Sequence, residues 1–209
     1  MATRYAVIER ILRAVYGEQP TDDSSTTGNL VNQWMNDAIG SAAKLNYKDS
    51  LSMDGVAYIN NSFYTTFKGL TFTQDENFVF VSTLPQIPFG LGKNEGIGSV
   101  KFKDSSGSVS LDAIPISENQ WGYYQQLPRI PNKILYKSEG LFIYAISTID
   151  LSQGYTANVT MVSGGDSTNQ NSVLNVPDDY IPIIIDYCVE KLKTQRFIPK
   201  VIANDGTGS

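Results

Sequence analysis

The hydrophobic pattern of this 209-residue chain changes its period twice, from helical to alternating and back to helical. Residues 3–16 and 29–46 place their apolar side chains on one side of a helix. From about residue 51, short runs rich in β-branched and aromatic residues follow one another, which is typical of strands. Helical spacing returns at about residue 178. Because no single amphipathic helix buries its apolar face alone, we expect the helices from both chain ends to pack together.

The first predicted helix, residues 3–16, has a signal at each end. Thr3 is a suitable N-cap and Gly17 a suitable stop. Arg10 and Arg13 lie on one half of the cylinder. The other half carries the apolar side chains of Tyr5, Val7, Ile8, Ile11, Leu12, Val15 and Tyr16.

The second predicted helix, residues 29–46, follows a polar linker at 18–28 in which Thr26 and Thr27 are the N-cap candidates. Its pattern is the clearest amphipathic signal in the chain. The centre of the apolar arc consists of Val31, Trp34, Met35, Ala38, Ala42 and Leu45. The residues predicted to face away from this arc are Asn32, Gln33, Asn36, Gly40 and Lys44.

The third predicted helix, residues 178–196, is apolar on more than one side. If Asp178 or Asp179 caps it, Pro182 falls in the first turn, where its missing N–H has no intrahelical partner to lose. One wide arc contains Ile181, Ile184, Ile185, Cys188, Val189 and Leu192. A second strip, formed by Tyr180, Ile183 and Tyr187, predicts packing against the β region or a neighbouring subunit; the alternative is that it belongs to the internal core.

The region between the helices, residues 51–174, predicts an antiparallel β-sandwich or barrel. Leu70–Thr73 and Phe78–Ser82 flank a polar turn and predict a hairpin. Further strand-like runs lie at 98–102, 107–114, 133–137, 140–146 and 155–162. Turn signals at 103–107 and 137–140 separate some of these runs.

The predicted fold class is therefore α+β, with a small helical bundle from both chain ends and an inserted antiparallel β domain. The expected division assigns 1–50 to the helical part, 51–174 to the β domain and 175–209 to the C-terminal helix and tail. The polar segment 163–172 is expected to be flexible or ordered by a partner, and the tail 203–209 to be disordered when free.

The residue inventory excludes several kinds of active site. The chain has no histidine, which excludes Ser-His-Asp and Cys-His catalysis and His-based zinc sites. Its single cysteine, Cys188, excludes an internal disulfide framework and Cys-based metal sites, and is predicted to be a small core residue. We therefore predict that the chain is not an enzyme and binds no metal or cofactor.

Charge and hydropathy limit the surroundings of the chain. The net charge is −5 and no block of Lys and Arg stands out, so tight sequence-independent DNA binding is not expected. The N-terminal stretch carries charges throughout, unlike a signal peptide, and no apolar run is long enough to cross a bilayer. We expect a protein that is made and kept in a cytoplasm.

Two segments outside the helices predict contacts with other proteins. The first is the Pro- and Gly-rich connection 84–100, whose glycine spacing does not match a phosphate-binding loop. Its apolar side chains are Ile87, Phe89, Leu91 and Ile97. The second is the aromatic group Trp121, Tyr123 and Tyr124. Three interpretations stay open: half-buried rings on a strand and turn, anchors of a protein interface, or a surface on which sugar rings stack.

Four blocks of sequence, in this order, resemble the neck proteins of tailed bacteriophages, in particular the ring or head-to-tail adaptor proteins of crAss-like podoviruses. They are "NLVNQWMNDAIGSAAKLNY", "YINNSFYTTFKGLTF", "LPQIPFGLG" and "VPDDYIPIIIDYCVEKLK". The resemblance implies a structural role without catalytic residues. Such adaptors form rings, commonly twelvefold, beneath the portal, where they extend the DNA channel and offer a platform for the next tail component.

We therefore predict a virion protein, assembled in the host cytoplasm, that forms a homo-oligomeric ring between portal and tail. Double-stranded DNA is expected to pass through it without specific binding. The predicted subunit or partner contacts are Ile87, Phe89, Leu91, Ile97, Trp121, Tyr123, Tyr124, Tyr180, Ile183 and Tyr187.

Two other functions stay open at this point. One is a carbohydrate-binding β module of a phage or cell-surface protein, centred on Trp121. The other is a glycosidase that uses a pair of carboxylates. The candidates for that pair are Asp54, Glu95, Asp104, Asp112, Glu118, Glu139 and Asp150.

Overall fold

The computed structural model describes residues 2–17, 24–75, 79–91, 96–107, 109–126, 133–165 and 169–197. The chain forms two compact units. We call Met1–Asn46 with Gly165–Ser209 the helical unit, and Tyr47–Gly164 the β unit. The expected boundaries were 50/51 and 174/175. Residues 165–174 belong instead to the helical unit, since backbone hydrogen bonds tie this segment to the start of the first helix.

The first helix, α1 (Arg4–Tyr16), confirms both predicted end signals. The Thr3 side chain accepts a hydrogen bond from the Ala6 N–H at 3.2 Å, as an N-cap does. Gly17 ends the helix with φ 83°, a left-handed conformation that glycine adopts without a steric penalty.

The segment 163–172, expected to be flexible or ordered by a partner, is partly ordered by the chain itself. The N–H groups of Arg4 and Tyr5 donate to the carbonyls of Ser172 and Gln170 at 3.1 and 2.8 Å. A helix leaves its first N–H groups without intrahelical acceptors, and here two of them find acceptors in this segment. The expectation was therefore wrong for the described residues 169–172.

The second helix, α2 (Ser24–Asp54), has 31 residues and is longer at both ends than the predicted 29–46. Thr26 and Thr27 lie inside the helix, so neither is its N-cap. Of the predicted linker 18–28, residues 24–28 are therefore helical, and residues 18–23 lie outside the described residues. The helix ends at Gly55, which has φ 69° and donates its N–H to the Leu51 carbonyl at 3.1 Å. Its last turn was missed because the apolar residues Leu51 and Met53 are two positions apart, a spacing that does not place them on one face of a helix.

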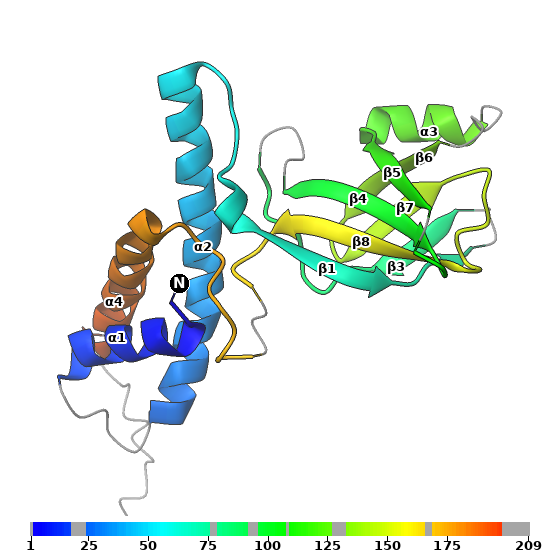
Figure 1. Ribbon diagram of the computed structural model, residues 1–209. Helices are drawn as coiled ribbons and strands as arrows, with labels where there is room; N and C mark the ends of the chain where they lie inside the picture. The colour runs from blue at the N-terminus through cyan, green and yellow to red at the C-terminus, as the bar shows by residue number, and fades with distance from the viewer. Residues whose placement is uncertain are drawn as a thin grey trace, which may run out of the picture. The chain divides into compact units, whose positions relative to one another are not determined.

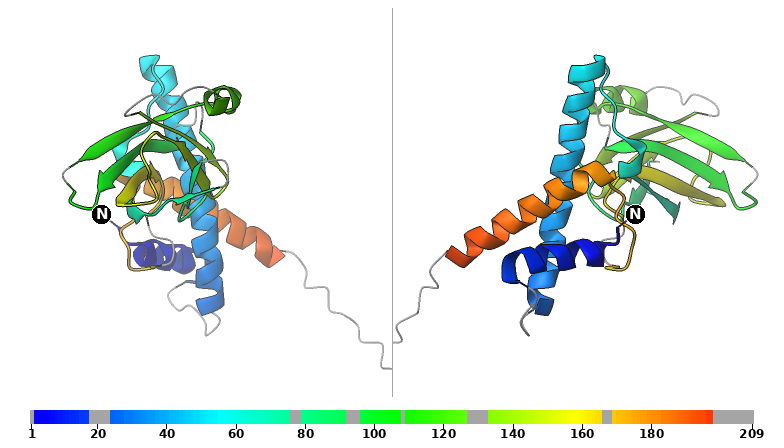
Figure 2. Two further views of the ribbon diagram at one scale, coloured as in Figure 1. Left: turned by 90° about the vertical axis from the view of Figure 1, so that its right-hand side faces the viewer. Right: turned by 60° about the vertical axis from the view of Figure 1, so that its left-hand side comes forward.

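A short 3₁₀ turn, η3 (Asp178–Tyr180), precedes the last helix, α4 (Ile181–Phe197). Pro182 is the second residue of α4, in the first turn as predicted. Figure 2 shows α1 and α4 lying beside each other, and their residues are in contact. Fully buried side chains of this unit are Val7, Ile11, Val31, Met35, Ile39, Ile184 and Cys188. Burial raises the pKa of the Cys188 thiol to about 12, as a core position predicts.

One arginine is buried in the helical unit, where the sequence pattern predicted a different arrangement. Arg4 is 0% exposed and donates hydrogen bonds to the side-chain oxygens of Asn32 at 2.7 Å and Asn36 at 2.6 Å. Asn32 and Asn36, predicted to face away from the packed side of α2, therefore meet α1. Because they are four residues apart, they lie on one face and hold the two ends of the guanidinium.

The β unit contains one curled, eight-stranded sheet in the order β1-β8-β4-β5-β6-β7-β3-β2 (Figure 1). Its elements are η1 (Asn61–Phe63), β1 (Tyr64–Leu70), β2 (Thr73–Gln74), β3 (Phe80–Thr83), β4 (Ile97–Asp104), β5 (Ser110–Pro115), α3 (Glu118–Gln126), β6 (Ile134–Glu139), β7 (Phe142–Ile146) and β8 (Tyr155–Val162). The strands predicted from alternation are present, and β2 and β3 form the predicted hairpin with shifted ends.

The sheet turns at β5, which pairs with two different neighbours along its length. Its first half, Ser110–Asp112, pairs antiparallel with β4, and its second half, Ala113–Pro115, pairs parallel with β6. The described pairs include none between β1 and β2, the two edge strands. The predicted α+β class with helices from both chain ends is confirmed, whereas the β region is a half-barrel with one parallel pair and a sandwich is not confirmed.

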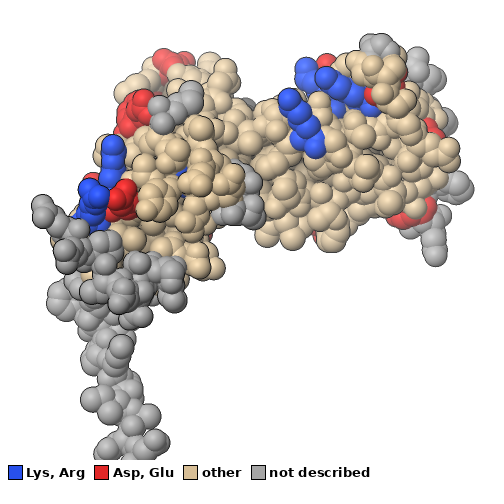
Figure 3. Space-filling model, turned by 60° about the horizontal axis from the view of Figure 1, so that its bottom comes forward, with Lys and Arg blue, Asp and Glu red and all other residues tan. Residues whose placement is uncertain are grey.

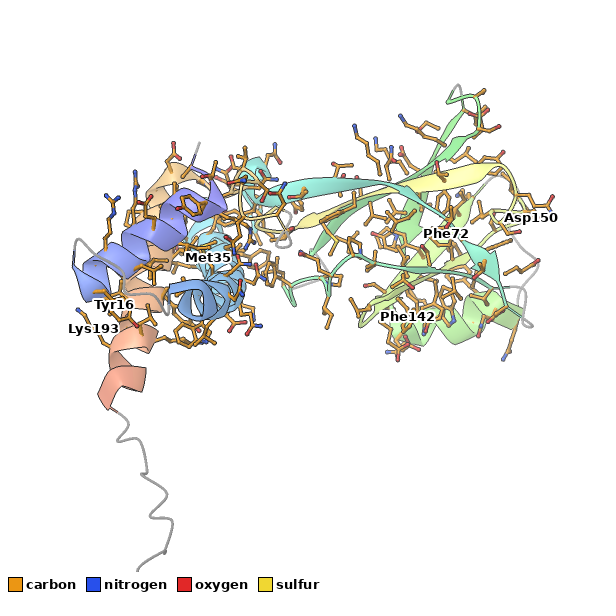
Figure 4. All side chains as sticks on the ribbon, turned by 90° about the horizontal axis from the view of Figure 1, so that it is seen from below. Tyr16, Met35, Phe72, Phe142, Asp150 and Lys193 are labelled. Atoms are coloured by element: carbon orange, nitrogen blue, oxygen red, sulfur yellow. The ribbon has the colours of Figure 1, made fainter. Side chains whose placement is uncertain are left out.

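The concave side of the sheet holds the core of the β unit. Phe102 is 0% exposed, and its ring packs against that of Phe72 at 4.9 Å between centroids. Figure 4 shows Phe72 in the interior and Phe142 at the outer surface. The other members of this core include Phe80, Leu84, Val100, Ile134, Ile143, Leu151, Val159 and Met161.

Candidate functional site

The apolar side chains of the 84–100 connection differ in exposure. Ile87 is 61% exposed, whereas Phe89 and Leu91 are partly buried and line a small hollow of about 160 Å³. Ile97 is 7% exposed and belongs to the core of the β unit, so it is not available as a surface contact. Ile97 is buried because the pairing of β4 with β8 shifts register between Ile97 and Ser99, so that Ile97 and Val100 both point toward the core.

The aromatic group lies on a helix, not on the strand and turn that were predicted. In α3, Trp121 is 6% exposed and packs on the sheet, with Tyr124 partly buried beside it. Tyr123 is 63% exposed, with its ring 5.7 Å from that of Tyr124. The helix was missed because three aromatic residues in four positions are as typical of a strand as of a short amphipathic helix.

Lys137 covers the exposed side of Trp121. Its Nζ lies 5.1 Å from the centre of the Trp121 ring and 5.3 Å from that of Tyr144, within cation–π distance of both. The same Nζ donates to both carboxylate oxygens of Glu118 at 2.9 Å. Lys137 thus fastens α3 to β6 and β7, and a sugar ring could not stack on Trp121 without displacing it.

Replacing Lys137 with alanine is expected to loosen α3 from the sheet and to lower the free energy of unfolding by about 1–2 kcal/mol. The substitution removes an ammonium group that lies over two aromatic rings and pairs with Glu118 and Glu139. Trp121 becomes more exposed, so its fluorescence emission moves to longer wavelength. Lys133→Ala, at an exposed position one residue before β6, is the matched control and should leave both quantities nearly unchanged. Equal effects of the two substitutions would contradict this role of Lys137.

The strip predicted on the third helix is mostly engaged within the helical unit. The Tyr180 hydroxyl accepts a hydrogen bond from the Asn46 side chain at 3.1 Å. Tyr187 is partly buried beneath Lys191, whose Nζ lies 4.7 Å from the ring centre. A hydrogen bond to Tyr187, with the charges of Tyr187 and Asp37, raises the pKa of Lys191 above its usual value. Ile183 is 41% exposed and is the member of the strip available for an external contact.

The two most exposed large apolar residues among those described, Met53 and Val56, lie in a segment that the sequence analysis did not select. Leu51, Met53 and Val56 expose 49%, 83% and 64% of their surfaces at the C-terminal end of α2 and just beyond it. We call these three residues the 51–56 segment. Among the described residues, no other element covers these three side chains.

Each unit also has a groove. A groove of about 660 Å³ in the β unit is lined by Ala57, Tyr58, Ile59, Asn61, Tyr64, Thr66, Gly98, Ser99 and Thr160. The Tyr64 ring lies flat against Gly98, where a β-carbon would approach it to 2.8 Å. A groove of about 540 Å³ in the helical unit is lined by Ala2, Arg10, Asp178, Ile181, Pro182, Ile185 and Asp186.

The candidate catalytic carboxylates mostly have structural partners. Asp104 accepts hydrogen bonds from Ser106 and the Val109 N–H in the β4–β5 turn, and Asp150 accepts from Ser152. Glu118 and Glu139 both pair with Lys137, and Asp112 pairs with Lys101. Asp54 is exposed at the end of α2, and Glu95 lies outside the described residues.

Among the described residues, no group of three or more Asp, Glu or Cys side chains could hold a metal ion. None of the described helices is both long enough and apolar enough for a membrane crossing. No protein-family model matches the chain, and neither does any curated protein sequence. The function is therefore inferred from the surfaces that the chain's own residues form.

Proposed function

We propose that this chain is a structural protein of a bacteriophage virion that forms a closed ring of identical copies at the neck. The ring connects the portal protein to the tail and extends the DNA channel. The observation that carries this proposal is the exposed 51–56 segment, together with the sequence blocks that resemble phage neck adaptors.

The 51–56 segment favours contact with another protein because its apolar side chains have no cover within the described chain. Met53 exposes 83% of its surface, and Leu51 and Val56 expose about half or more. Burying such a side chain contributes roughly 1.5–3 kcal/mol, so a partner that covers these residues would be bound favourably.

A ring of identical copies needs two different surfaces on each copy, because the contact runs head to tail. The groove in the helical unit supplies a concave surface with an apolar floor of Ile181, Pro182 and Ile185. In the proposed ring, the 51–56 segment of one copy packs into that groove of the next. Ile183, exposed on the same helix, is a further apolar side chain that a neighbouring copy would cover in this ring.

The experiment measures assembly of the full chain, alone and with the portal protein of the same genome, by native mass spectrometry and negative-stain imaging. Wild-type protein is expected to form a ring, of twelve copies by the resemblance. Met53→Asp combined with Val56→Asp should weaken assembly at least tenfold, since each charge would be buried unpaired in the contact. Val109→Asp introduces one such charge at another exposed valine and should leave assembly intact.

Two results would overturn the proposal. One is a chain that stays monomeric both alone and with the portal protein. The other is a ring that forms equally well from the double variant, which would show that the 51–56 segment takes no part. Far-ultraviolet circular dichroism of each variant confirms that the fold is retained.

A further inference from the structure

We propose that the outer face of β1, β8, β4 and β5 contacts the phosphate backbone of double-stranded DNA without reading its sequence. This inference rests on the proposed function, because a neck ring surrounds the passing genome. The face is built from Lys68, Lys101, Lys103, Thr66, Asn158 and Thr160, and we call it the lysine face.

The strand pattern places these side chains together on the side away from the core. Val100 and Phe102 of β4 are buried in the core, so Lys101 and Lys103, which alternate with them, point outward. Lys101 lies opposite Asn158 on β8. On the next strand, Thr66 lies opposite Thr160, and their hydroxyl oxygens are 2.8 Å apart.

Alternation along β1 brings the third lysine to the same face, next to a bulge. The pairing of β1 with β8 shifts between Phe67 and Leu70, and the Gly69 N–H donates to the Asn158 side chain at 3.3 Å. Phe67 packs against the core, and the next residue, Lys68, is exposed. Lysines from β1 and β4 thus flank the Asn158 row of β8 from both sides.

The charge of this face is opposite to that of the whole chain. The chain carries −5, yet the described residues of these four strands hold three lysines against two carboxylates, Asp104 and Asp112. Asp104 accepts hydrogen bonds from Ser106 and the Val109 N–H in the β4–β5 turn. Asp112 pairs with Lys101 at 3.5 Å, and both side chains stay more than half exposed. Figure 3 shows basic side chains grouped on the β unit.

The residue types favour phosphate over a protein partner. Lys, Ser, Thr and Asn are the side chains that contact phosphate and sugar oxygens in protein–DNA complexes. Protein interfaces are depleted in Lys and Ser and enriched in aromatic residues at their centres. The lysine face itself consists of lysine, threonine and asparagine side chains, and Ile114 on β5 is an exposed aliphatic side chain on the same side of the sheet. The centre of the face therefore offers little that a second protein could bury.

The 660 Å³ groove continues the lysine face. Thr66, Ser99 and Thr160 form its floor and belong to the same side of the sheet. Tyr58 and Tyr64 stand at its walls, and Tyr58 is 51% exposed. A sugar–phosphate ridge can lie along such a hollow and accept hydrogen bonds from the tyrosine and threonine hydroxyls.

Contacts of this kind are individually weak but add up in a ring. Each copy offers three hydrated ammonium groups on flexible side chains, and every copy of the ring presents the same set to the channel. Together these contacts hold the duplex at the centre of the channel, and their combined affinity for DNA falls steeply as the salt concentration rises. No single contact holds the DNA in place, which suits passage of a genome.

The test measures binding of a fluorescently labelled random-sequence duplex to the full chain by anisotropy, at several salt concentrations. Lys68→Gln, Lys101→Gln and Lys103→Gln are combined in one variant. The control combines Lys44→Gln, Lys48→Gln and Lys133→Gln, three exposed lysines elsewhere that remove the same charge. The lysine-face variant should bind at least tenfold more weakly at low salt, with the slope of log K against log salt reduced by about 2.7 per copy. The control should stay within twofold of wild type.

Three results would overturn the inference: no binding of wild-type protein at the lowest salt, equal losses in the two variants, or equally tight binding of poly-glutamate, which would indicate an acidic protein partner. Ring assembly of every sample is followed in parallel by native mass spectrometry. A ring that assembles normally from the lysine-face variant but loses DNA separates this inference from the proposed function. A chain that binds DNA through the lysine face without forming a ring overturns the proposed function alone.

Discussion

Replacing Phe102 with alanine is expected to lower the free energy of unfolding of the β unit by about 4 kcal/mol. Phe102 is 0% exposed, its ring packs against Phe72, and its strand lies between β8 and β5 in the sheet. Truncation removes the transfer free energy of a whole ring and leaves a cavity that neighbouring strands cannot close without breaking their register.

The two tryptophans of the chain allow this loss to be assigned to one unit, because Trp34 lies in α2 and Trp121 in α3. In a Trp34→Phe background, urea unfolding followed by fluorescence reports on the β unit. Phe142→Ala is the matched control, since Phe142 is also on a strand but is 46% exposed, and it should cost about 1 kcal/mol or less. Similar losses at the two positions would show that Phe102 is not a core residue.

Replacing Arg4 with alanine is expected to lower the free energy of unfolding of the helical unit by about 3 kcal/mol. The change removes two hydrogen bonds from a charged donor and leaves the side-chain oxygens of Asn32 and Asn36 facing a cavity. It also separates the first turn of α1 from α2. Circular dichroism during urea unfolding, with hydrogen exchange of the α1 amides, measures the loss.

Two further substitutions sharpen the result for Arg4. Arg13→Ala removes an exposed arginine of the same helix, paired with Glu9, and should cost no more than about 0.5 kcal/mol. Arg4→Lys keeps the charge but cannot reach both asparagines in the fork geometry, so an intermediate loss is expected. If Arg4→Ala were as mild as Arg13→Ala, the buried arrangement would be wrong.

Local signals in the sequence predicted the features that depend on local chemistry. Thr3 and Gly17 bound α1 because capping and left-handed backbone involve only neighbouring residues. Pro182 is tolerated in the first turn of α4 for an equally local reason. The strands were recognised because alternation records which side of a sheet is buried.

Exposure at the candidate site could not be predicted in this way. Ile97 and Trp121 were among the predicted contacts with other subunits or partners, yet a register shift on β4 and the packing of α3 on the sheet bury them. Met53 drew no attention, although it is the most exposed large apolar residue among those described. Whether an apolar side chain is core or contact depends on which distant elements reach it, and spacing along one element does not contain that information.

Composition and periodicity alone determined that this chain has three long helical stretches around a β region, no histidine and a single cysteine that cannot form a disulfide within the chain. Only the tertiary structure decided the curl of the sheet at β5, the burial of Arg4 against α2 and the gathering of three lysines on one sheet face. The physical reason is that helix ends and strand alternation arise from interactions between near neighbours. Strand order, register and burial arise from contacts between residues far apart in the chain, whose free energies the local pattern does not record.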